Sequence, residues 1–71
     1  MMNNPRERFI KLEEVMHITG LKRTTIYNRM NADEFPKNIK LGHNNIAWLE
    51  SEIRAWMQEK INQRNQEGQK E

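Results

Sequence analysis

The residues best suited to chemistry lie between positions 22 and 30, in the segment KRTTIYNRM. Arginine can pair with phosphate oxygens or read guanine through two hydrogen bonds, and an asparagine amide matches the donor and acceptor of adenine. Threonine and tyrosine hydroxyls can donate to phosphates, and threonine can also touch a thymine methyl group. These residue types indicate contact with DNA. The candidate residues of this segment are Lys22, Arg23, Thr24, Thr25, Tyr27, Asn28 and Arg29.

The same segment also fits a solvent-exposed helix face that carries ordinary charges. A helical period places Ile26 and Met30 on one side, one turn apart, and turns Thr24, Tyr27 and Asn28 the other way. Periodicity assigns the faces of a helix, but it does not assign base contacts. The choice between the two interpretations therefore depends on the neighbouring elements.

A short helix is expected just before this segment, from about Leu12 to Thr19. Its apolar positions recur at helical spacing, and polar residues such as His17 fall on the opposite side. Gly20 follows where a helix C-terminus favours a residue that tolerates positive φ. Helix, tight turn and second helix form a helix-turn-helix unit, whose second helix enters the major groove.

Residues 37–48 change period and predict a two-stranded hairpin over 39–48. Ile39 and Leu41 alternate with a lysine, and the GHNN that follows Leu41 is rich in turn-forming residues. Such a hairpin behind a helix-turn-helix would be a wing that touches flanking phosphates or the minor groove. Turn chemistry explains the tip asparagines equally well. The candidate wing contacts are Lys40, His43, Asn44 and Asn45.

The last segment predicts an amphipathic helix that continues to about Gln63, beyond which no apolar residue remains. We therefore expect a flexible N-terminal arm over residues 1–8, a folded domain over 9–63 and a frayed polar tail over 64–71. The arm region supplies cations for DNA backbone contacts. The cations expected there are Arg6, Arg8 and Lys11, and the predicted core consists of Phe9, Ile26, Leu41, Trp48 and Trp56.

The length, the cysteine content and the net charge of the chain limit which folds and partners are possible. The chain has 71 residues and no cysteine, so it has a small core and neither a disulfide nor a thiolate metal site. The formal net charge is +2, but residues 1–40 hold eight basic against five acidic residues, while residues 41–71 hold four against five. The positive half contains the candidate segment, which suits a polyanionic partner, although ordinary solubilising charge explains the imbalance as well.

Other function classes find little support. The glutamates have no accompanying nucleophile, and His17 and His43 have no thiolate to complete a metal site, so we expect no enzyme, metal, cofactor or small-molecule substrate. No apolar run approaches the roughly 18 residues of a membrane span, and the N-terminus lacks a signal-like apolar stretch. We expect a cytoplasmic protein. The glutamates considered for acid–base catalysis are Glu13, Glu14, Glu50 and Glu52, all expected to be exposed.

Three blocks of sequence carry a resemblance to a known family. ITGLKRTTIYNRM, FPKNIKLG and IAWLESEIRAWM, in this order over about residues 9–61, resemble the AlpA-type prophage regulators. These are small winged helix-turn-helix proteins related to phage excisionases and to the DNA-binding domains of MerR regulators. The resemblance implies a mainly α fold with a small two-stranded hairpin. It also implies a transcriptional activator or repressor that binds double-stranded DNA through a recognition helix at about 23–31.

The chain departs from the family pattern in three places. Family members commonly have serine at the position of Lys22, glycine near Asp33 or Glu34, and arginine in the wing where Asn44 and Asn45 stand. The first change replaces a capping hydroxyl with a cation, and the third removes a typical wing contact.

Three functions remain open from the sequence. One is a sequence-specific regulator of a prophage or mobile element that acts in two or more copies, since a single module covers few base pairs. Another is an excisionase-like factor that bends DNA. The third is an antirepressor- or antitoxin-like adaptor without DNA binding, which the modest charge, the missing wing arginine and the amphipathic last helix favour.

Overall fold

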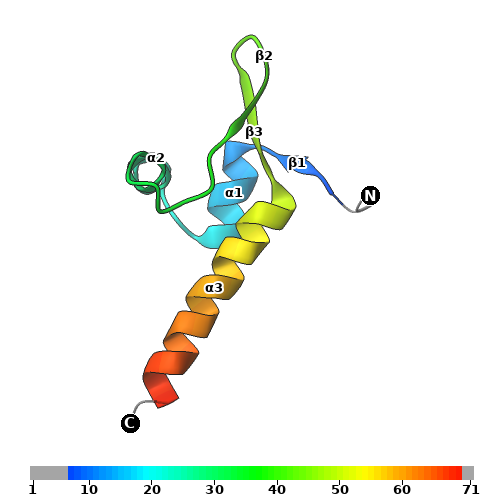
Figure 1. Cartoon of the computed structure of the whole chain (residues 1–71). Coiled ribbons are helices and arrows are strands. Elements are labelled where there is room, and N and C mark those ends of the chain that lie inside the picture. The colour runs from blue at the N-terminus through cyan, green and yellow to red at the C-terminus, as the bar shows by residue number, and fades with distance from the viewer. Residues whose placement is uncertain (1–6, 70–71) are drawn as a thin grey trace.

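Three helices and three antiparallel strands make up the fold of residues 7–69, the part of the chain that the computed structural model describes (Figure 1). The hairpin projects from one end of the molecule, and the last helix extends from the other end. The helix bounds for the first two helices and the position of the hairpin agree with the sequence prediction. In order, the elements are β1 (Phe9–Ile10), α1 (Leu12–Thr19), α2 (Arg23–Asn31), β2 (Ile39–Gly42), β3 (Asn45–Leu49) and α3 (Glu50–Gln69).

A tight turn separates α1 from α2. Gly20 adopts a φ of 77°, and its N–H donates to the carbonyl oxygen of Met16 at 2.8 Å. The Thr19 hydroxyl donates to a backbone carbonyl of α1 and accepts the N–H of Leu21 at 3.2 Å. Because a side chain at this left-handed position is disfavoured, glycine ends α1 here at little cost. The helix-turn-helix unit is therefore specified locally.

The C-terminal end of α2 closes with a second left-handed residue. Asp33 has a φ of 60° and donates its N–H to the Met30 carbonyl at 3.1 Å. The N–H of Glu34 donates to the Arg29 carbonyl at 2.7 Å, which completes the Schellman pattern of hydrogen bonds. Glycine would adopt this left-handed conformation without strain, so it would suit the position of Asp33. The turn also directs Phe35 into the core.

The sheet has three strands in the order β1-β3-β2, whereas the sequence predicts only the β2–β3 hairpin. Ile10 pairs with Trp48 and Phe9 with Leu49. The predicted two-stranded hairpin is present, and β1 adds a third strand that the sequence does not predict. A two-residue strand is too short to show any period, and its pairing with β3 depends on residues almost forty positions away.

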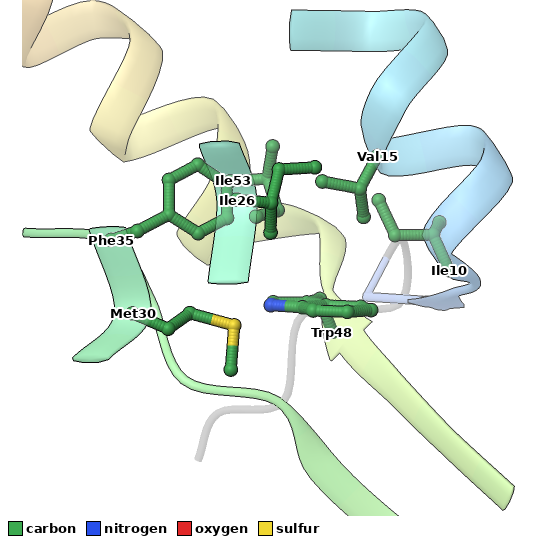
Figure 2. Packing of buried hydrophobic residues seen from close by; sticks show 7 residues of the cluster. All are labelled: Ile10, Val15, Ile26, Met30, Phe35, Trp48 and Ile53. Atoms are coloured by element: carbon green, nitrogen blue, oxygen red, sulfur yellow. The ribbon is translucent and has the colours of Figure 1, made fainter. Parts of the chain in front are cut away.

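The core gathers side chains from every element except β2 (Figure 2). Trp48 and Ile26 are fully buried as predicted, but Phe9 and Leu41 are 55% and 41% exposed, so their assignment to the core is wrong. Phe9 precedes Ile10 in β1 and thus points to the opposite face of the sheet. Leu41 lies at the irregular pairing between Lys40 and Gly42, in the hairpin that projects from one end of the molecule. The core cluster consists of Ile10, Val15, Ile26, Met30, Phe35, Trp48 and Ile53.

Helix α3 begins directly after β3 and packs its first turns against the domain. Ile53 is fully buried, and Trp56 and Met57 are partly buried, whereas Ile61 is 40% exposed. The helix continues to Gln69, further than the limit near Gln63 that the loss of apolar residues predicts. The division into arm, domain and frayed tail stays a prediction.

An ionic cluster joins the segment before β1 to the start of α3. Glu50 accepts hydrogen bonds from Arg8 and from Arg54, each at a closest distance of 3.0 Å, and Arg8 also lies 3.7 Å from Glu14. The hydrogen bond from Arg8, with that from Arg54, lowers the pKa of the Glu50 carboxyl below its ordinary value. Ser51 donates to Glu7 at 3.0 Å. Glu50 is therefore partly buried rather than exposed as predicted.

Replacing Glu50 by glutamine should lower the free energy of unfolding at neutral pH. Because the folded-state pKa is lowered, the stabilisation is fully present above the ordinary carboxyl pKa and is lost as the pH falls through the lowered one. Urea unfolding of Glu50→Gln and the parent chain between pH 3 and pH 7 should give curves that converge at the acid end. The matched control is Glu52→Gln, which removes an exposed carboxylate. Equal stabilities at pH 7 would contradict the role of the cluster.

Candidate nucleic-acid interface

Helix α2 presents a polar side to solvent because its apolar side is held by Ile26 and Met30, which are 0% and 8% exposed. The predicted residues of this segment are distributed around the remaining surface. Those that are exposed are Lys22, Arg23, Thr24 and Asn28, and those that are partly buried are Thr25, Tyr27 and Arg29. The outward side predicted from periodicity is present at Thr24 and Asn28, whereas Tyr27, predicted on the same side, is partly buried against the core.

A hollow of about 710 Å³ lies between the start of α2, the start of α1 and the hairpin. Arg23 and Tyr27 line it from α2, and Asn44 and Ile46 line it from the hairpin. The Arg23 guanidinium lies 5.8 Å from the centre of the Tyr27 ring, and Tyr27 packs against the core. The structure therefore brings the N-terminal part of α2 and the hairpin tip to one side of the molecule.

The hairpin tip exposes all four predicted wing residues, but two of them also have local structural roles. Asn44 has a φ of 57°, the left-handed conformation that asparagine tolerates in turns. The side-chain oxygen of Asn45 accepts a hydrogen bond from the Lys11 ammonium, which also donates to the Ile46 carbonyl at 3.4 Å. Lys40 and His43 are exposed at the same tip. Lys11, for which the sequence predicts a DNA backbone contact, ties the hairpin to the start of α1, and its contact with DNA stays a prediction.

Arg29 lies apart from the other predicted contacts. Its guanidinium sits 5.8 Å from the centre of the Trp56 ring, on the side of α2 that faces α3. Arg8 is likewise engaged with Glu50, while Arg6 lies outside the described residues. Periodicity could not reveal these contacts, because their partners are more than twenty residues away in the chain.

Within 7–69 there is no group of three or more histidine, aspartate or glutamate side chains that could hold a metal ion. His17 and His43 are both exposed, one on α1 and the other at the hairpin tip. None of the helices in this range is both long and apolar enough to cross a membrane.

Comparison with known proteins identifies one matching family and two relatives. Residues 8–61 match the family described as Prophage CP4-57 regulatory protein (AlpA). Over 66 residues the chain is 33% identical to the DNA-binding transcriptional activator AlpA of Escherichia coli K12, in a match that covers 84% of this chain and 94% of that protein. It is also 50% identical over 56 residues to uncharacterized protein ORF88 of Enterobacteria phage P4. This second match covers 79% of this chain but only 64% of the phage protein.

Replacing Lys22 by serine should stabilise the fold by about 1 kcal/mol. Lys22 occupies the N-cap position of α2 in extended conformation, and its side chain makes no capping hydrogen bond. A serine hydroxyl there can accept an N–H of the first turn, whereas Lys22→Ala removes the same charge without adding a cap. Urea unfolding should rank Lys22→Ser above both the parent chain and Lys22→Ala. Equal stabilities of the two variants would contradict the missing cap.

Proposed function

Because the chain belongs to the AlpA family of prophage regulatory proteins, we propose that it is a sequence-specific, DNA-binding transcriptional regulator of a prophage or related mobile element. The observation that carries this proposal is the exposed polar side of α2, which stands beside the hairpin tip with cations at its start. The E. coli relative is described as a DNA-binding transcriptional activator, which supports the same function here.

In the proposed complex, α2 lies in the major groove with its outward side toward the base edges. Asn28 is exposed and suits adenine, while Thr24 is one turn earlier on the same side and can touch a thymine methyl group or a phosphate. Lys22 and Arg23 stand at the N-terminal end of α2, where both backbone N–H groups and cations favour phosphate oxygens.

The β2–β3 hairpin acts as the wing in this proposal. Lys40 and His43 are exposed and not engaged in any ion pair within residues 7–69, so they are free to approach a flanking phosphate. Asn45 keeps its contact with Lys11 and holds the tip in place. One nine-residue recognition helix reads only a few base pairs, so we propose that two or more copies bind neighbouring sites.

Footprinting of the purified protein over the DNA that flanks its own gene tests the function. A protected site of a few base pairs per copy is expected, and a duplex of that site is then titrated at several salt concentrations. Arg23→Ala should weaken binding severalfold. Because one phosphate contact is lost, the negative slope of log affinity against log salt should become shallower by about 0.9.

The matched control for this experiment is Arg64→Ala, which removes the same charge from the exposed far end of α3. It should leave both the affinity and the salt slope near those of the parent chain. The proposal is wrong if no site is protected, or if Arg23→Ala and Arg64→Ala give the same salt series.

A further inference from the structure

The indole of Trp56 lies where α3 meets the C-terminal end of α2. Its Nε1 donates to the Glu34 carbonyl at 2.9 Å, and its ring meets the ring of Phe35 edge to face at 4.8 Å between centroids. Arg29 and Lys60 both place their cationic groups over the indole, at 5.8 and 5.5 Å from its centre. Trp56 thus contacts α2 and the two residues that follow its closing turn.

The two arginines of α2 have different surroundings. Arg29 follows Ile26 by three residues and precedes Met30, so it lies at the edge of the buried side, toward α3. Arg23 lies on the other flank, where it lines the hollow beside the hairpin. Arg29 is partly buried against Trp56, whereas Arg23 is exposed. A DNA backbone that follows the outward side of α2 is therefore within easier reach of Arg23 than of Arg29.

Few contacts fix the orientation of α2 on the domain. Only Ile26 and Met30 are buried on this nine-residue helix, and a helix of this length depends on tertiary packing for its stability. Tyr27 packs partly against the core on the flank that carries Arg23, so it restrains rotation of the helix about the line through Ile26 and Met30 on that flank. The contact between Arg29 and Trp56 adds a restraint to one side of that line, close to the C-terminal end.

We propose that Arg29 and Trp56 are positioning residues, which set the angle at which the recognition helix meets DNA, and that Arg29 makes no phosphate contact. The inference rests on the proposed function, since it assigns roles within the same DNA interface. It also revises the sequence-based set of contacts, which treats Arg23 and Arg29 alike. Sequence recognition requires side chains held within about 0.5 Å of their working geometry, so a small rotation of α2 matters.

The contact itself is tested without DNA by a double-mutant cycle in urea unfolding. Arg29→Met keeps the aliphatic length without the charge, and Trp56→Leu removes the aromatic face. The two changes should be coupled by about two- to fivefold in the folding equilibrium constant, the range of a partly exposed cation–π contact. Arg29→Lys should recover part of the loss. Strictly additive effects would overturn the proposal.

The positioning role is tested with two DNA probes, at a temperature where circular dichroism shows every variant folded. On a mixed-sequence duplex, Arg29→Met should keep the salt slope of the parent chain, as should the control Arg64→Met. On the duplex of the footprinted site, Arg29→Met should lose about fivefold or more in affinity, the cost of one imperfect base contact. The ratio of specific to non-specific affinity therefore falls, which a general loss of stability would not produce.

Two results separate failure of this inference from failure of the proposed function. A negative salt slope that is shallower by about 0.9 in Arg29→Met would show a lost phosphate contact. That result would overturn the positioning role while leaving DNA binding intact. An unchanged ratio of specific to non-specific affinity would also overturn it. A parent chain without preference for any flanking site would overturn the proposed function.

Discussion

Burial of the Trp48 indole holds the hairpin to the helices. Trp48 is the largest of the fully buried side chains within residues 7–69, and its Nε1 donates to the Pro36 carbonyl at 3.1 Å, so the polar atom of the ring is also satisfied. The ring lies among Ile10, Ile26 and other core side chains (Figure 2). Truncation of a buried tryptophan costs about 3–5 kcal/mol, and a domain with so small a core has little more to lose. The placement of the hairpin beside α2, and with it the candidate interface, depends chiefly on this residue, and the contact between Lys11 and Asn45 adds to it.

Sequence reasoning predicted most of the fold because the decisive signals are local. Gly20 marks the turn between α1 and α2, and apolar residues at helical spacing locate both helices. Strand β1 was missed because its pairing is non-local. Phe9 and Leu41 were wrongly assigned to the core because hydrophobicity indicates that a side chain favours burial, but not whether a covering element lies above it.

The candidate site was predictable to a smaller extent. Periodicity correctly separates the buried Ile26 side of α2 from the outward Asn28 side, since one helix determines both. It cannot distinguish Arg23 from Arg29, because the difference lies in what each meets across the molecule. The same limit applies to Lys11, whose contact with Asn45 spans more than thirty residues of chain. Which predicted residues touch DNA stays a prediction.

Part of the basic excess lies where α2 and the hairpin come together. The basic excess falls in the first forty residues, and Arg23, an exposed cation of α2, lines the hollow where this helix and the hairpin come together. Residues 60–67 of α3 are exposed, and the far end of the helix points away from the hairpin. The surface formed by α2 and the hairpin tip is thus built on a core of few residues.

The proposed function requires that the surface formed by α2 and the hairpin tip meets DNA. Amide chemical-shift mapping by NMR, with the isotope-labelled chain titrated by a duplex of the protected site, measures this contact residue by residue. The largest changes are expected on residues 22–28 and 40–45, and residues 58–69 should change little. Changes concentrated on α3, with α2 and the hairpin tip unaffected, would contradict the proposed function.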